Sequence, residues 1–231
     1  FSGSIAHSPD IGGSLWSADC REIYEEGLCI PPVKFLQEGQ PNQDVEEIIL
    51  GNVRLPDQVL GDLNAQVTAN KVCGRRLLEF LEDSDLADLS RLSTALQGRA
   101  EMAMRHAIEE VPDGVYHSSL DADGFDEDET HLECTITVKG SDLKIDYEGT
   151  SKQIHRGLNT VMNYTQAYSA YPVKCALDPY TPRNEGSYRP IEVVAPVGSI
   201  LNPRYPAPCN ARQLTGHLLA GVIYGALAQA V

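Results

Sequence analysis

The chain has 231 residues, of which 42% are hydrophobic, so it is long enough for one large domain or two small ones with a substantial core. Its formal net charge of −15 argues against nucleic acid or an anionic membrane as a partner, because phosphate binding needs a positive surface. The basic residues are mostly arginine and the surface is acidic, a balance that suits either a high-salt cytoplasm or simply an acidic enzyme.

The first residues to carry candidate chemistry read Ala-His-Ser-Pro-Asp-Ile-Gly-Gly, at positions 6–13. His7 and Asp10 stand three residues apart, and the two glycines after them let the backbone turn. Imidazole nitrogen and carboxylate oxygen suit zinc or manganese, so the pair could supply half of a catalytic metal shell. Alternatively, His7 hydrogen-bonds within a loop and Asp10 opens an Asx-turn ahead of the glycines. The spacing alone leaves both interpretations open.

Helical patterns follow. Residues 44–50 predict a short helix, and Pro56, at a helix N-terminal position, predicts the start of a longer one that runs towards Leu81. Ser84-Asp-Leu introduces another predicted helix, in which apolar residues recur every three or four positions. These residues are Leu89, Leu92, Leu96, Ala100, Met104 and Ile108. Such a stripe indicates packing, and Pro112-Asp-Gly114 ends it.

The middle of the chain predicts β-structure. Apolar and polar residues alternate strictly over positions 132–139, and after Gly140-Ser-Asp142 the alternation resumes at positions 143–147. We therefore expect a hairpin with one buried face.

The acidic segment 121–129 resembles the start of an EF-hand loop. Its glycine, Gly124, is at the fourth position of the loop instead of the sixth, and the twelfth position holds Leu132 instead of glutamate. We interpret the segment as a solvated acidic turn between two strands, with weak adventitious cation binding as the alternative.

The last third predicts a helix from about Leu158 to Val173, a strand over 191–195, a turn over 196–199 and a helical apolar run from Leu218 to Val231. The predicted fold class is α+β: a helical segment, then an antiparallel β hairpin or sheet, then a helical C-terminal part. A possible subdivision separates residues 1–112, with site loops and helices, from 113–231, with the β-rich part and its closing helices. Neither a Gly-x-Gly-x-x-Gly nor a Walker A motif occurs, so we expect no ATP binding by those routes.

The six cysteines lie far apart and form no Cys-x-x-Cys pair, which fits neither a zinc finger nor a small disulfide scaffold. We expect reduced, mostly structural thiols. No stretch approaches the roughly 18 uninterrupted apolar residues of a membrane span, and no signal peptide precedes Phe1. A cytoplasmic protein is therefore expected.

Many separated motifs of this sequence resemble, in order, the B-type subunits of the hydantoinase/oxoprolinase family. They lie at residues 6–13, 21–35, 52–56, 61–66, 70–77, 149–153, 157–159, 182–186, 189–191, 195–203 and 206–208 and at Arg212. The resemblance covers nearly the whole chain. Two positions depart from the family pattern. Cys29 replaces the basic residue usual in Gly-Leu-x-Ile-Pro-Pro, and Ser8 stands where oxoprolinase-like members often carry a second histidine, which disfavours 5-oxoproline as the substrate.

Amidohydrolases of this family open small cyclic amides and imides, such as 5-oxoproline or N-substituted hydantoins, at the expense of ATP. The resemblance implies that ATP is bound by an A-type partner, which phosphorylates the carbonyl oxygen, while the B-type part completes hydrolysis. Phosphorylation is needed because a lactam is resonance-stabilised and its oxygen is a poor leaving group. A divalent metal, zinc or manganese, held partly by His7 and Asp10, would lower the pKa of bound water from about 15.7 to about 7.

Carboxylates and cations supply the other candidate roles. Glu25 or Glu26 is a candidate general base, or a support for a ligand histidine, with surface carboxylates as the alternative. Arginines suit a substrate carboxylate or the phosphate of an activated intermediate, although each of them could equally form a structural salt bridge. The arginine candidates are Arg54, Arg75, Arg76 and Arg212.

Side-chain amides in glycine-bearing loops complete the candidate set. Gln153, Asn159 and Asn184 could orient a polar ring substrate or merely satisfy loop backbone.

The chain resembles a piece of a longer protein. Family members carry an upstream segment with an Asn-Asp-Pro turn and a Thr-His-Leu-Pro-Asp-like motif, and this sequence lacks both. We therefore expect a partial family domain whose metal site is incomplete. Two other functions remain open: a subunit of a related ATP-dependent ketone carboxylase acting on acetone or acetophenone, and a non-catalytic scaffold for the A-type partner.

Overall fold

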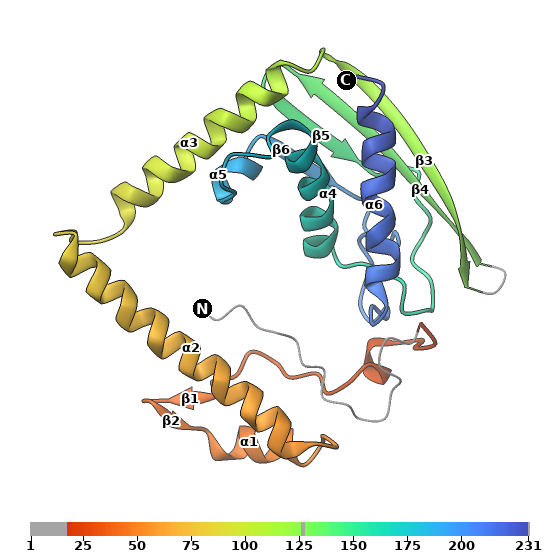
Figure 1. Ribbon diagram of the computed structural model, residues 1–231. Coiled ribbons are helices and arrows are strands. Elements are labelled where there is room, and N and C mark those ends of the chain that lie inside the picture. The colour runs from red at the N-terminus through yellow and green to blue at the C-terminus, as the bar shows by residue number, and fades with distance from the viewer. Residues whose placement is uncertain (1–17, 126–127, 231) are drawn as a thin grey trace. The chain divides into compact units, whose positions relative to one another are not determined.

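The computed structural model describes residues 18–125 and 128–230, and the chain divides into two compact units (Figure 1). The described part of the first unit is residues 24–89. The second unit contains residues 18–23 and everything from Ser90 onwards. The boundary between the two units therefore lies after residue 89, whereas the subdivision predicted from the sequence placed it after residue 112. The difference arises because the helix after Ser90 packs within the second unit.

The first unit begins with a small hairpin and a short helix. Strands β1 (Leu36–Gln37) and β2 (Gln40–Pro41) pair antiparallel across Glu38 and Gly39, which both have positive φ, as a tight two-residue hairpin turn requires. Helix α1 (Gln43–Leu50) follows at once and confirms the predicted helix at 44–50.

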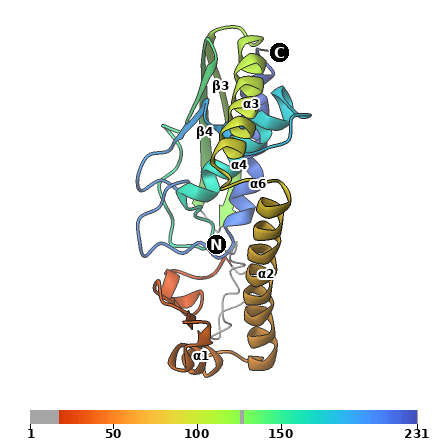
Figure 2. The same ribbon diagram turned by 90° about the vertical axis from the view of Figure 1, so that its left-hand side faces the viewer.

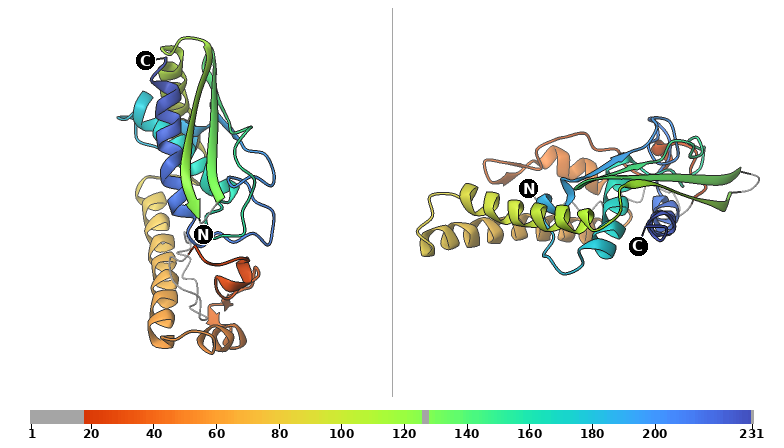
Figure 3. Two further views of the ribbon diagram at one scale, coloured as in Figure 1. Left: turned by 90° about the vertical axis from the view of Figure 1, so that its right-hand side faces the viewer. Right: turned by 90° about the horizontal axis from the view of Figure 1, so that it is seen from above.

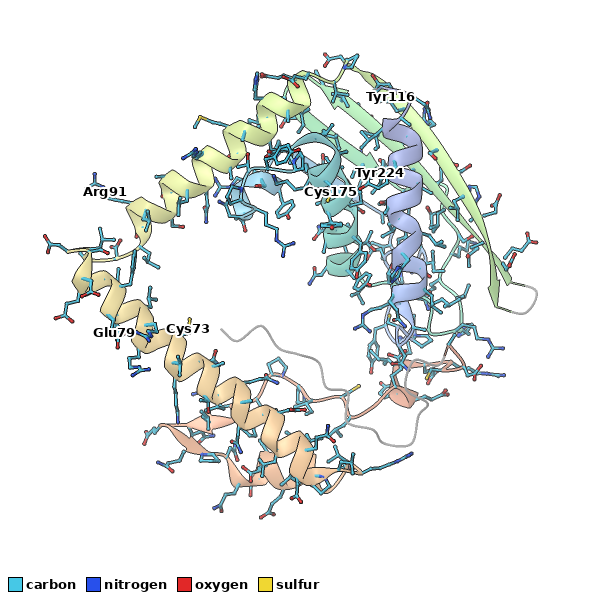
Figure 4. All side chains as sticks on the ribbon, viewed as in Figure 1. Cys73, Glu79, Arg91, Tyr116, Cys175 and Tyr224 are labelled. Carbon is cyan, nitrogen blue, oxygen red and sulfur yellow. The ribbon has the colours of Figure 1, made fainter. Side chains whose placement is uncertain are left out.

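Helix α2 (Pro56–Asp83) is the longest element and contacts α1. Pro56 lies in its first turn, where a missing N–H costs no helical bond, so the predicted start is confirmed. In the part of the chain that the structure describes, α2 has no buried residue, and residues 68–78 are all exposed. Cys73 lies on this stretch (Figure 4).

The third predicted helix begins later than expected. Ser84-Asp-Leu closes α2 instead of opening a helix: the N–H of Ser84 donates to Phe80 O at 3.0 Å, and Asp85 has a φ of 52°. Helix α3 then runs over Ser90–Glu109 and buries Ala100, Met104 and Ile108, as the apolar stripe predicted.

A four-stranded sheet forms the centre of the second unit. Its order is β3 (Gly114–Phe125), β4 (Asp128–Lys139), β5 (Asp142–Asp146) and β6 (Ile191–Val194). The first three strands are antiparallel, which confirms the predicted hairpin, and β6 is parallel to β5. The alternating residues of β4 that were predicted to face inwards are buried. They are Leu132, Cys134, Ile136 and Val138.

Helices α4 (Met162–Leu177) and α6 (Arg212–Leu227) lie side by side against the sheet (Figures 1 and 3). A Cβ at Gly225 would collide with Ser118 Oγ, so this glycine lets α6 approach β3 closely. Buried Tyr147 donates to or accepts from Ser169 Oγ at 2.6 Å, which joins the sheet to α4. The α+β class is therefore confirmed.

The short helix α5 (Glu185–Tyr188) explains why α3 belongs to this unit. Arg189, just after α5, donates to Gln97 Oε1 at 2.7 Å and to Glu101 Oε2 at 3.1 Å on α3. Helix α3 thus belongs to the same unit as β3 and β4, and Figure 2 labels all three.

Several predicted boundaries need correction. α4 begins at Met162 instead of near 158, because residues 158–160 form buried coil, and it continues through Pro172 to Leu177. α6 begins at Arg212, six residues before the predicted apolar run. The acidic segment joins two strands as predicted, but most of it extends those strands. Residues 126 and 127 lie outside the described residues.

Among the described residues, no helix combines the length and the apolar character that crossing a lipid bilayer requires. All six cysteines are free; Cys20, Cys134 and Cys209 are buried and the other three are exposed.

Candidate functional site

Two loops of the second unit hold most of the family-like motifs of its sequence. One loop connects β5 to α4 and the other connects β6 to α6. They are joined by backbone hydrogen bonds: Ile200 N to Ser151 O at 2.9 Å, and Gln153 N to Gly198 O at 2.9 Å. The two loops therefore form one hydrogen-bonded assembly near the N-terminus of α6.

The side chain of Asn159 connects the two loops of this assembly. It is fully buried, and its Oδ1 accepts from Ile154 N at 2.9 Å. Its Nδ2 donates to the carbonyl oxygens of Ile154, Arg156 and Pro208 at 2.8, 3.0 and 2.8 Å. These contacts match the backbone-satisfying interpretation of Asn159 that the sequence had left open, and they leave its amide no donor for a substrate.

The other two candidate amides also hold backbone. Gln153 Oε1 accepts from Arg204 N at 2.7 Å, and its Nε2 donates to Arg204 O at 3.5 Å. Asn184 caps α5 by accepting from Gly186 N at 2.9 Å and donates to Leu96 O at 3.2 Å. In the structure all three amides therefore position loops, and a direct role on substrate stays a prediction.

The segment that follows the His7 motif joins this assembly. Ala18 O accepts from Gly157 N at 2.9 Å, and Ile23 N donates to Pro206 O at 2.9 Å. The predicted metal ligands His7 and Asp10 lie outside the described residues. Residues 18–125 and 128–230 contain no group of three or more His, Cys, Asp or Glu side chains placed to hold a metal ion.

Glu25 and Glu26, the predicted catalytic carboxylates, follow Ile23 closely in the sequence. Glu25 closes the 3-10 turn Ile23–Glu25 and is exposed, and Glu26 is half-buried. Both belong to the first unit. Their assignment as a general base or as a support for a ligand stays a prediction.

Arg212 is the one candidate arginine in the loop assembly. It is the first residue of α6, and its Nη1 donates to Cys209 O at 3.2 Å. Its guanidinium lies 5.7 Å from the ring centroid of Tyr164, within cation–π range. Tyr164 in turn stacks on Tyr168 at 4.2 Å. Burial and the contact with Tyr168 raise the pKa of Tyr164, although Arg212 opposes the shift.

The remaining candidate arginines belong to the first unit. Arg75 and Arg76 of α2 both pair with Glu79, at 3.9 and 3.0 Å, and are largely exposed. These pairs match the salt-bridge alternative. Arg54 is exposed between α1 and α2. The structure thus brings Gln153, Asn159 and Arg212 into one assembly, whereas Arg54 and Arg75 lie in a different unit.

Two cavities of the second unit were missed by sequence reasoning. The first, about 510 Å³, lies between the two loops and is lined by Lys152, Ser199 and Arg204 among others. The second has the same volume, about 510 Å³, and lies between α4, α5 and β6, with Arg183 at its wall. Lys152 lies within the family-like motif at 149–153, and Arg204 directly follows the motif at 195–203; these positions were the only clue to the first cavity that the sequence offered.

A charged cluster lies on β3 and β4. His131 Nδ1 is 2.6 Å from Asp121 Oδ1, and its Nε2 is 3.2 Å from Glu133 Oε2. These two hydrogen bonds raise the pKa of His131, and the bond with Asp121 has the larger effect. Both imidazole nitrogens are thereby occupied, so the cluster fits a cross-strand tie.

Comparison with known proteins supports the family resemblance. A sequence model described as hydantoinase B/oxoprolinase matches residues 1–231. The putative B-type subunit of a D-/L-hydantoinase from Pseudomonas sp. (strain NS671) is 35% identical over 248 residues, which cover 100% of this chain and 42% of that protein.

Two solved structures share the fold. The ATP-dependent caprolactamase of Pseudomonas jessenii matches with a TM-score of 0.87 and 31% identity over 96% of this chain and 39% of that chain. A nucleotide-free acetone carboxylase matches with a TM-score of 0.80 and 14% identity over 96% of this chain and 32% of its own, a likeness that shows the fold alone.

This chain therefore spans about two fifths of the hydantoinase chain and of the caprolactamase chain. The motifs that carried the resemblance run through both units, and the matched region is the entire sequence. The chain belongs to the hydantoinase B/oxoprolinase family.

Proposed function

We propose that this chain is part of the B-type subunit of an ATP-dependent hydrolase of cyclic amides or imides. The substrate would be a lactam or hydantoin ring, activated by phosphorylation on an A-type partner that binds the ATP. The observation that carries this proposal is the family match over the whole chain, with a hydantoinase B-type relative at 35% identity and an ATP-dependent caprolactamase at 31%. We further propose a cytoplasmic location.

Within this proposal the chain's own residues have distinct tasks. His7 and Asp10 would hold a divalent cation, zinc or manganese, together with ligands from outside the described residues. That cation would supply Lewis-acid chemistry at the activated ring. Glu25 or Glu26 would accept a proton from the attacking water or orient a ligand. The ties of Ala18 to Gly157 and of Ile23 to Pro206 support this arrangement, because they fix the chain that follows the ligand motif to the loop assembly.

The reaction is tested with the full-length chain, its A-type partner, ATP and a panel of lactams and hydantoins. We expect at least one ring to open in an ATP-dependent manner, measured as formation of the amino acid from a lactam or of the N-carbamoyl amino acid from a hydantoin. Failure to open any ring of the panel would refute the hydrolase.

The cation is tested separately on the full-length chain. We expect His7→Ala and Asp10→Ala to abolish tight zinc or manganese binding, measured by metal analysis after dialysis. His106→Ala is the matched control, because His106 is a largely exposed residue of α3. Tight binding that survives both substitutions would remove His7 and Asp10 from the metal site. Loss of binding would contradict a purely structural scaffold.

A ketone carboxylase is the second candidate, and the fold shared with acetone carboxylase supports it. Bicarbonate-dependent formation of a carboxylated product from acetone or acetophenone, without ring opening, would favour it over the hydrolase.

A further inference from the structure

We propose that the cavity between the two loops binds an oxyanion of a small molecule, a phosphate or a carboxylate, through Lys152 and Arg204. The identity of that molecule rests on the proposed function, in which an activated phosphorylated ring and a carboxylate product both occur. The cavity volume of about 510 Å³ lies within the range of roughly 300–1,000 Å³ of small-molecule sites.

The charge of the cavity is the first observation. Lys152 and Arg204 both line it, and within residues 18–125 and 128–230 neither side chain has an ion pair or a hydrogen bond. Glu148 is the one carboxylate among the lining residues that the structure describes. The chain has a formal net charge of −15, whereas the charged residues that line this cavity, two cations and one carboxylate, give it a net positive charge. Such a charge suits a negatively charged ligand.

The second observation is how the two cations are held. Lys152 stands opposite Ser199 in an antiparallel bridge, so the two side chains leave the backbone on the same face. Gln153 binds both the N–H and the carbonyl of Arg204. A Cβ added at Gly198 would lie 3.7 Å from Arg204 Nε, which places the guanidinium beside that glycine. Hydrogen bonds to the backbone of the loops, and not ion pairs with carboxylates, therefore bring Lys152 and Arg204 to one cavity.

An orphan hydroxyl is the third observation. Ser199 is 4% exposed, and its Oγ is buried without a hydrogen-bond partner among the described residues. A buried polar group without a partner costs free energy, and rotation of the Ser199 side chain towards the cavity would let an acceptor there recover it. Deprotonated phosphate and carboxylate oxygens accept hydrogen bonds, and both form strong charge-assisted hydrogen bonds with arginine and lysine.

Calorimetric titration of the full-length chain with inorganic phosphate, and separately with glutarate, tests this site. We expect one of the two probes to bind, and Arg204→Gln and Lys152→Met each to weaken that binding about tenfold or more, since each removes a charge-assisted contact. Arg204→Lys, which keeps the charge, should retain most of it. The probe that binds identifies whether the site takes a phosphoryl or a carboxylate group.

Matched controls use cations elsewhere in the same unit. Arg183→Gln alters the wall of the other cavity, and Lys139→Met removes an exposed lysine at the end of β4, so both should bind the probe as the wild type does. Binding of neither probe to the wild type, or unchanged binding in Arg204→Gln and Lys152→Met, would overturn the inference. Ring opening assayed in parallel separates the two proposals: an inactive protein that still binds the probe refutes the hydrolase and leaves the anion site standing.

Discussion

Replacement of Asn159 provides the most direct test of the loop assembly. Its buried amide makes four hydrogen bonds, and all of them go to backbone groups of Ile154, Arg156 and Pro208. Asn159→Ala would leave the Ile154 N–H and these carbonyl oxygens unsatisfied. Asn159→Asp would be worse, because a carboxylate oxygen would then face carbonyl oxygens that now accept from the amide nitrogen.

The size of the effect follows from these contacts. A hydrogen bond contributes roughly 0.5–1.5 kcal/mol net, and buried groups left unsatisfied add to the loss, so Asn159→Ala should cost about 2–4 kcal/mol. If the loops open locally, that cost corresponds to roughly 30- to 1,000-fold faster exchange of the Ile154 amide hydrogen.

Hydrogen exchange followed by mass spectrometry on the full-length chain measures this change in peptides that contain Ile154. Asn163→Ala is the matched control: the side chain of Asn163 is exposed and has no hydrogen-bond partner among the described residues, so exchange at Ile154 should not change. Unaltered exchange in Asn159→Ala, accompanied by lost activity, would show that Asn159 acts on the substrate and not on the loops.

Two further predictions concern titratable groups. The raised pKa of His131 means that its bonds to Asp121 and Glu133 stabilise the fold fully below the unfolded value of about 6.5, and that this stabilisation is lost as the pH rises through the folded value. The melting temperature of His131→Gln should therefore depend less on pH over this window than that of the wild type. The difference should be small, because the His131 side chain is 38% exposed. Parallel plots of melting temperature against pH for the two proteins would contradict this expectation. Burial raises the pKa of Cys134 to about 12. Iodoacetamide should therefore modify Cys134 only after unfolding, and should modify exposed Cys29, and exposed Cys73 and Cys175 (Figure 4), in the folded chain, as read by peptide mass spectrometry. Labelling of Cys134 in the folded chain would be inconsistent with its burial.

Much of the fold could be predicted from local patterns. The period-two alternation over 132–139 and 143–147 indicated β4 and β5 correctly, because alternate residues of a strand face one core. Pro56 located the start of α2. The parallel pairing of β6 with β5 could not be predicted, because a four-residue apolar run carries no information on its partner or its direction. Ser84 was misassigned because the same residue type can open one helix or close another.

The site was harder to predict for a similar reason. Its amides were located in loops correctly, yet their partners are distant in sequence: Gln153 binds the backbone of Arg204, and Asn159 that of Pro208. Lys152 and Arg204 share a cavity only because these long-range contacts form. The roles of His7 and Asp10 stay predictions.

The place of β6 in the sheet has a consequence for how the second unit acquires its structure during synthesis. Strands β3, β4 and β5 follow one another directly, so their pairings can form as soon as residue 146 has left the ribosome. β6 joins only after the intervening helices α4 and α5 have been made, and pairings across such long separations form slowly. The loop that carries Ser199 and Arg204 follows β6. We therefore expect the anion-binding cavity to be among the last parts of this unit to mature.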